Sequence, residues 1–260
     1  MIGLLLVRDR PVPWGHALSA LLYVSNYYNA ILGDPNTAFS HTWSLSIEEQ
    51  FYLLWPIALL VLWRRRVKSA RVLGCAVALV WLIRAALILI ANLDQGYVYS
   101  AFEMRADALL VGCLLAVVLS SQSLNRLTKL QWPTWAPAAT IAVGVLCAMG
   151  DALPIARYSD IVAFAVLPPI IALLILQLLG LSTKAPWRWL EHPALSYLAR
   201  LSYSMYLYQQ ITLGPVRHML VAYPLVIQLC GAFAATIVLA AASYHCVEKP
   251  FLRLKDRPAR

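Results

Sequence analysis

The sequence predicts an all-α, polytopic bundle of transmembrane helices with seven full spans, and three observations support that fold class. Hydrophobic residues make up 61% of the 260 residues and charged residues only 13%, whereas a soluble domain has about 25% charged residues. Seven apolar stretches approach the length of about 20 residues that a helix needs to cross a bilayer. Basic residues cluster between alternate stretches, as they do in membrane proteins. This composition excludes a soluble enzyme, a disordered chain and a disulfide scaffold.

The predicted spans follow one another along a single membrane domain of residues 1–260. They cover residues 47–63, 72–91, 101–120, 135–150, 161–180, 198–213 and 224–247. The fourth and sixth are short for a full crossing. Pro168 and Pro169 stand in the middle of the fifth span, where the loss of two backbone donors predicts a kink.

The basic residues predict the orientation of the bundle. Five of them closely follow the first predicted span, and further clusters follow the third, fifth and seventh spans. Acidic residues prevail in the intervening loops, which contain Asp94, Asp151 and Asp160. Because short basic loops stay in the cytoplasm, the pattern predicts a cytoplasmic C-terminus. This clustering also accounts for the net charge of +9, so we expect no nucleic-acid partner.

The N-terminal residues fit the pattern less well. Residues 14–32 are moderately apolar but carry His16 and several Ser, Asn and Tyr side chains. They indicate either an eighth span or, as we favour, a helix that lies at the outer membrane interface. Residues 1–7 look like the end of a helix whose beginning is missing.

Two carboxylates stand at the start of the first predicted span. Ser46 and Glu49 have the spacing of a capping box, in which each side chain bonds a backbone N–H at the helix start. This pairing explains Glu49 and leaves Glu48 without a structural role. Glu48 shares a helix face with Ser44 and Tyr52, four residues away on either side. Glu48 is therefore a candidate functional residue, with a structural role as the alternative.

Charged residues also occur within the second and third predicted spans. A helix that began only after Asp107 would be too short to cross the bilayer, so we expect Arg105 and Asp107 to lie below the membrane surface and to need partners. Arg105 is suited to holding a phosphate or carboxylate. Arg84 lies near the middle of its span, where an unpaired charge is costly, so it should meet an acid or a carbonyl.

Four motifs, in this order, resemble those of the membrane acyltransferase family 3, whose members acylate O-antigens and exopolysaccharides. They are WSLSIEEQFYLLWP at residues 43–56, RADALLVG at residues 105–112, LSYSMYL at residues 201–207 and VEKPF at residues 247–251. Together they extend over nearly the whole chain, which makes the resemblance specific.

The resemblance implies a multi-pass enzyme of the bacterial inner membrane that moves an acyl group, often acetyl, from acyl-CoA to a hydroxyl of a cell-envelope glycan or lipid-linked sugar. It implies membrane lipid as a partner, acyl-CoA as the donor substrate, and neither a metal nor a further cofactor. The seven spans would be the last seven of the family's ten helices.

This chain departs from the family at two places. The family's catalytic histidine, which lies eleven residues after an arginine in the first helix, has no counterpart here. Gln209 and Gln210 stand where a histidine usually follows the third motif. These departures indicate a fragment, a wrongly started gene or a degenerate copy, and we favour the fragment.

The leading hypothesis assigns Arg105 to binding or polarising the substrate and Glu48 to orienting the absent histidine. The other residues expected at the substrate site are Trp43, Ser44, Glu49, Tyr52, Asp107 and Tyr206. The hypothesis requires Glu48 and Arg105 to face one polar hollow. The alternatives are a non-catalytic membrane protein that keeps the fold and a small-solute transporter, for which broken helices and inverted repeats are typical.

Overall fold

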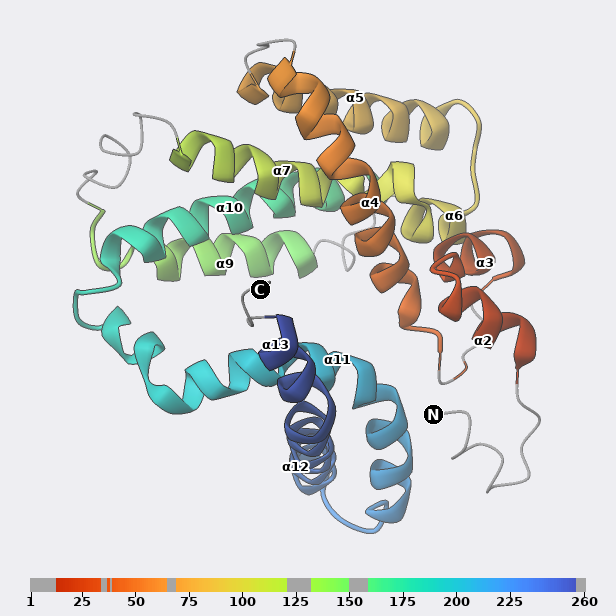
Figure 1. Cartoon of the computed structure of the whole chain (residues 1–260), viewed down its shortest axis with the longest axis vertical. Helices are drawn as coiled ribbons and strands as arrows, with labels where there is room; N and C mark the ends of the chain where they lie inside the picture. The colour runs from red at the N-terminus through yellow and green to blue at the C-terminus, as the bar shows by residue number, and fades with distance from the viewer. Residues whose placement is uncertain are drawn as a thin grey trace. The chain divides into compact units, whose positions relative to one another are not determined.

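The protein consists of helices joined by turns and short loops in the part of the chain that its computed structural model describes, which is residues 13–33, 37, 39–64, 69–120, 132–149 and 159–255. Every regular element in these residues is a helix, so the predicted all-α class is confirmed (Figure 1). The chain divides into two compact units, one made of Pro13–Trp189 and the other of residues 190–255.

The larger unit contains most of the helices. Its described α-helices are α2 Trp14–Leu21, α3 Ser25–Leu32, α4 Thr42–Arg64, α5 Ser69–Leu89, α6 Gln95–Ser100, α7 Phe102–Ser120, α9 Ala136–Ala148 and α10 Phe164–Leu181. A π-helical turn, Ser159–Ala163, leads into α10. A 3-10 turn, Trp187–Glu191, connects the two units.

Each predicted span coincides with a helix, and the predicted helical membrane bundle is confirmed. The stretches of the described residues that are long and apolar enough to cross a membrane are Thr42–Leu62, Ser69–Leu89, Ile161–Leu181 and Leu225–Arg253. The helix α9 is shorter, with 13 residues. The helix α7 carries Glu103, Arg105 and Asp107 in its first two turns, so it is more polar than its neighbours.

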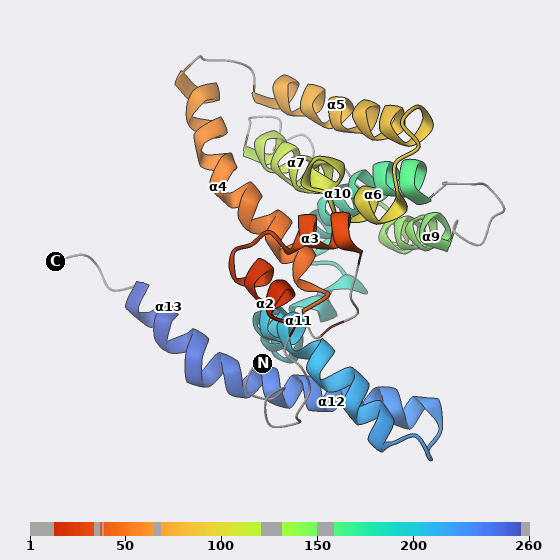
Figure 2. The same ribbon diagram turned by 90° about the vertical axis from the view of Figure 1, so that its right-hand side faces the viewer.

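The packing of the larger unit centres on α7. This helix packs against α5 on one side and α10 on the other, α9 packs on α10, and α4 crosses α7 (Figures 1 and 2). Leu73 and Ile88 on α5 and Met104 on α7 are at most 2% exposed. The helices α4 and α6 also contact α7. Among its charged residues, Asp107 is buried and Glu103 and Arg105 are half-buried.

The start of α4 differs from the prediction. The helix begins at Thr42, five residues before the predicted span, so Ser46 lies inside it. The Ser46 hydroxyl donates to the backbone carbonyl of Thr42 (3.1 Å). The predicted capping box of Ser46 and Glu49 is therefore wrong, because the backbone N–H groups that it would satisfy already belong to the helical ladder.

The segment before α4 forms two short helices in place of one long one. Tyr23 adopts the left-handed backbone conformation, with φ of 55°, between α2 and α3. Each helix has eight residues and so rises only about 12 Å, which excludes the alternative of an eighth span. The expected helix remnant at residues 1–7 lies outside the described residues.

The smaller unit is a helical hairpin followed by a short tail. Its α-helices are α11 Pro193–Met219, α12 Leu225–Ser243 and α13 Lys249–Lys255, with a π-helical turn at Tyr244–Glu248. The hydroxyls of Thr212 and Thr236 hydrogen-bond across the hairpin (2.5 Å), and Ser204 donates to the carboxylate of Glu248. Small and hydroxyl-bearing residues at such contacts are typical of helix packing in membranes.

Candidate functional site

The candidate site is built on the first turns of α7. Asp94 caps α6 by accepting a hydrogen bond from the Gly96 backbone N–H (2.9 Å), and α7 begins at Phe102, directly after α6. Successive residues of a helix point about 100° apart, so Arg105 and Asp107 turn towards different neighbours. The prediction that the helix begins before Arg105 is confirmed.

Asp107 is matched by residues of α5. Its Oδ2 lies 2.5 Å from Nη2 of Arg84, and the two side chains are 2% and 1% exposed. The indole Nε1 of Trp81 donates to the same oxygen (2.9 Å). The prediction that Arg84 meets an acid is confirmed, and the carboxylate charge of Asp107 is neutralised inside the bundle.

Arg105 has aromatic neighbours. Its guanidinium carbon lies 3.9 Å from the ring centroid of Phe164, 5.5 Å from that of Tyr99 and 5.8 Å from that of Trp43. We call these three rings the aromatic cage. A cation over ring faces gains electrostatic attraction, but the described residues give Arg105 neither an ion pair nor a hydrogen bond.

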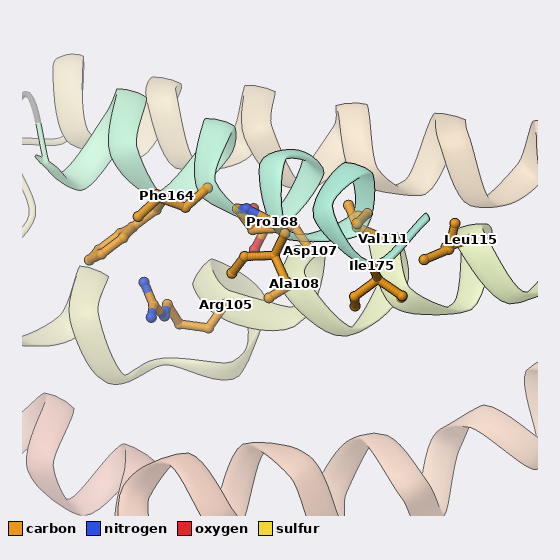
Figure 3. Close-up of a pocket in the computed structure, with 12 residues that line it drawn as sticks. Arg105, Asp107, Ala108, Val111, Leu115, Phe164, Pro168 and Ile175 are labelled. Atoms are coloured by element: carbon orange, nitrogen blue, oxygen red, sulfur yellow. The ribbon is translucent and has the colours of Figure 1, made fainter. Parts of the chain in front are cut away.

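A cavity of about 380 Å³ lies beside Arg105, between α7 and α10. Figure 3 shows the Phe164 ring close to the guanidinium of Arg105 at one end and Leu115 at the other. The residues that line this α7–α10 cavity are Arg105, Asp107, Ala108, Val111, Gly112, Leu115, Phe164, Leu167, Pro168, Ile171, Ala172 and Ile175. The cavity is apolar along its length, and its charged residues, Arg105 and Asp107, lie at one end.

The structure separates Glu48 from this cavity. Glu48 is half-buried on α4, but it is not among the residues that line the α7–α10 cavity. No ion pair joins Glu48 and Arg105 within the described residues. Glu48 therefore does not line the α7–α10 cavity, and a hollow shared by Glu48 and Arg105 stays a prediction.

The other predicted site residues divide in the same way. Trp43 belongs to the aromatic cage, and Asp107 lines the cavity. Ser44 donates to the His41 carbonyl (3.5 Å), Tyr52 is 56% exposed and Glu49 is half-buried. Tyr206 is a half-buried residue of α11. Substrate roles for all of these residues stay predictions.

The sequence did not reveal three members of the site. Tyr99 and Phe164 complete the aromatic cage, and Trp81 holds Asp107. Phe164 is far from Arg105 along the chain and stands in an apolar stretch, where an aromatic residue carries no signal of its own. Only the packing of α10 on α7 brings the two together.

A second group of buried polar residues lies where α2 and α3 meet α4. The Ser25 hydroxyl pairs with that of Ser46 (2.8 Å) and accepts a hydrogen bond from that of Thr42 (3.0 Å). Asn26 and Gln50 exchange amide hydrogen bonds, with Gln50 Nε2 donating to Asn26 Oδ1 at 2.9 Å. We call these five residues the α2–α4 polar layer. Since its members satisfy one another, the layer attaches α3 to α4.

Comparison with known proteins identifies the family. The sequence matches the acyltransferase 3 family, described as an acyltransferase domain, over residues 2–245. The chain belongs to this family. The resemblance seen in the four motifs is thereby confirmed, and the match extends across both structural units.

Named relatives of this acyltransferase-family chain occur in several bacteria. YrhL of Bacillus subtilis is 30% identical over 260 residues, which cover 91% of this chain and 39% of YrhL. The peptidoglycan O-acetyltransferase OatA of Listeria monocytogenes is 29% identical over 261 residues, covering 91% of this chain and 40% of OatA. The O-acetyltransferase OatA of Staphylococcus aureus is 33% identical over 122 residues, or 42% of this chain and 19% of that protein.

The chain spans about two fifths of the length of YrhL and of the Listeria OatA. No solved structure matches it.

Proposed function

We propose that this chain is a single membrane domain of an O-acyltransferase, which moves an acyl group, often acetyl, from acyl-CoA to a hydroxyl of a cell-envelope glycan or lipid-linked sugar. Membership of the family supports acyl transfer, and the name of the Listeria relative favours an envelope glycan as acceptor. Arg105 carries the proposal, because it is a cation held by three rings at the end of a cavity. Such a group stabilises negative charge that develops during acyl transfer.

The reaction places a specific demand on the site. The oxygen of the sugar hydroxyl attacks the thioester carbonyl carbon, a new C–O bond forms, and the C–S bond breaks. A base takes the hydroxyl proton, and the leaving thiolate of CoA is protonated. Negative charge passes through the carbonyl oxygen, and Arg105 balances that charge. We assign Glu48 to orienting the base and Asp107 to holding the shape of the site through Arg84.

The proposed orientation puts the aromatic cage at the outer side of the inner membrane. The basic clusters favour a cytoplasmic C-terminus, and counting back along the helices then places Trp43, Arg105 and Phe164 at the outer ends of α4, α7 and α10. An envelope glycan would reach Arg105 from outside, where the acceptor is found. No metal or further cofactor is part of the proposed reaction.

The proposal is tested by assaying acylation in cells. The full-length protein is expressed in a bacterium whose own envelope O-acetylation has been deleted, and ester-linked acetate is released from the envelope glycan with alkali and measured. We expect acetate above background with the unmodified protein. Arg105→Ala should lower the rate by about 100-fold to 1,000-fold, as removal of a group that stabilises a developing oxyanion does.

Arg71→Ala is the matched control, because Arg71 is an exposed arginine on α5 outside the site, and it should retain full activity. Glu48→Gln tests the second assignment and should also lose activity. Full activity of both Arg105→Ala and Glu48→Gln would show that the site is wrongly assigned. No acetate with the unmodified protein, at normal amounts in the membrane, would favour a non-catalytic member of the family.

A further inference from the structure

The α7–α10 cavity has the length of one membrane leaflet. From Arg105 to Leu115, at its two ends, the axis of α7 rises about 15 Å. This is about half of the 30 Å hydrocarbon core of a bilayer. In the proposed orientation, the cavity therefore begins at the outer surface and ends near the middle of the membrane.

The shape of the cavity favours an extended occupant. Its volume of about 380 Å³ is drawn out along α7 between Arg105 and Leu115, which suits an extended hydrocarbon chain. The lining matches a chain, because every residue beyond Asp107 is apolar.

The charge at the outer end selects an anion. Asp107 also lines the cavity, but its carboxylate is paired with Arg84. That one carboxylate also attracts Arg105, so among the described residues two arginines share a single acid and one positive charge is left in excess at this end. A largely buried charge is costly unless it is paired, and a phosphate matches the planar guanidinium with two parallel hydrogen bonds.

The side of the cavity lets a lipid enter without leaving the membrane. Ile171 and Ile175 are 54% and 44% exposed, and Ala108 and Gly112 are exposed beside them on α7. An apolar rim that faces the hydrocarbon region admits a lipid chain sideways, whereas a water-soluble anion would meet no such path.

We propose that the α7–α10 cavity binds a single-chain lipid phosphate, with the phosphate at Arg105 and the chain between α7 and α10. The sugar acceptor is attached to this phosphate, so the lipid carries the acceptor hydroxyl to the outer surface beside the aromatic cage. This assignment of the acceptor rests on the proposed function and orientation. The binding of the lipid phosphate itself does not depend on acyl transfer.

Native mass spectrometry of the full-length protein in detergent tests the inference, because it counts the lipids bound to each protein. Geranylgeranyl phosphate serves as the single-chain probe. We expect one bound molecule per protein at saturation. Geranylgeraniol, which has the same chain without the phosphate, should bind at least about tenfold more weakly, since it lacks the charge-assisted hydrogen bonds to Arg105.

Two pairs of variants locate the bound probe. Arg105→Ala should weaken binding about tenfold, in line with the loss of those hydrogen bonds, whereas Arg71→Ala should not. Gly112→Leu fills the cavity midway, and an added Cβ there meets no atom within 4 Å, so the fold should tolerate it. We expect Gly112→Leu to abolish saturable binding of the probe.

Gly74→Leu is the matched control for Gly112→Leu. Gly74 lies on α5 beside a different cavity, and an added Cβ there also meets no atom within 4 Å. This variant should bind the probe normally. Circular dichroism of each variant confirms that it is folded before binding is measured.

Other outcomes would overturn the inference. Equal binding to Gly112→Leu and Gly74→Leu would place the probe elsewhere. If two-chain phosphatidylglycerol bound as tightly and with the same dependence on Gly112, the cavity would be a general lipid site. If palmitoyl-CoA did so, it would be a donor pocket. If the unmodified protein bound the probe normally but transferred no acetyl group, the proposed function would be refuted, while the lipid site would be supported.

Discussion

The α2–α4 polar layer and the Arg105 end of the α7–α10 cavity are both polar regions inside an apolar helix bundle, but they differ in how their polar groups are matched. In the polar layer, Ser25 and Asn26 are fully buried and hydrogen-bonded to neighbouring side chains. At the cavity, Arg105 lies among three ring faces and shares the single carboxylate of Asp107 with Arg84, so one positive charge is in excess among the described residues. A region whose groups satisfy one another is explained by stability, whereas an unmatched charge beside a cavity indicates a ligand.

The largest effect should come from Asp107→Ala. This change leaves the guanidinium of Arg84 buried without its counter-ion, and breaking a buried ion pair in this way costs about 3–5 kcal/mol. The free energy of unfolding, measured by titrating the purified protein from mild detergent into SDS, should fall by that amount.

The double variant Arg84→Met/Asp107→Leu is the control for this prediction, because replacing both charges by apolar residues removes the penalty of the unpaired charge. It should recover most of the lost stability. Equal stability of Asp107→Ala and the unmodified protein would mean that the pair does not form in the membrane.

Gln50→Ala should lower the free energy of unfolding by a smaller amount, and it tests whether the polar layer has a structural role. The change leaves the buried amide of Asn26 without its partner, and an unsatisfied buried polar group costs about 1–3 kcal/mol. The same unfolding titration measures it. If Asn26→Leu/Gln50→Met is no more stable than Gln50→Ala, the amide pair is not what the layer depends on.

Arg105→Ala should cost less stability than either of these changes. It removes contacts between the cation and the rings, which are worth about 0.5–2 kcal/mol, and leaves no buried partner charge. We therefore expect Arg105→Ala to unfold at nearly the same SDS fraction as the unmodified protein while losing acyl transfer. If Arg105→Ala lost as much stability as Asp107→Ala, Arg105 would have a structural role, and the contrast between the polar layer and the cavity would be wrong.

The smallest effect concerns pH. Tyr97 on α6 donates a hydrogen bond to the carboxylate of Glu103, which also accepts one from Tyr27 (2.8 Å). The hydrogen bond to Glu103 and partial burial raise the pKa of Tyr97 to about 12. Unfolded tyrosine ionises near pH 10, so the stabilisation is complete below about pH 10 and is lost as the pH rises towards 12.

We expect the melting temperature of the unmodified protein to fall more steeply between pH 10 and pH 12 than that of Tyr97→Phe, which lacks this hydrogen bond. Parallel curves for the two proteins would show that Tyr97 and Glu103 do not interact in the folded state. Circular dichroism in detergent across this pH range provides the measurement.

Several features of the site could be predicted from the sequence because they follow from the free-energy cost of placing an unpaired charge in an apolar solvent. The need of Arg84 for an acid and the early start of α7 are of this kind, and both are confirmed. The capping box of Ser46 and Glu49 failed, because local spacing cannot show that α4 begins at Thr42. The placement of Glu48 and Arg105 in one hollow stays a prediction; Glu48 does not line the α7–α10 cavity.

The sequence by itself determined that this chain is a helical membrane protein of the acyltransferase 3 family, because apolar length, basic loops and four motifs are properties of the chain alone. The tertiary structure decided which of the charged side chains on α7 is paired with an opposite charge and which lies among aromatic rings. Asp107 and Arg105 are two residues apart, yet one meets an arginine of α5 and the other meets the rings of Trp43, Tyr99 and Phe164. Helix packing sets those partners, and packing depends on contacts between residues far apart in the chain.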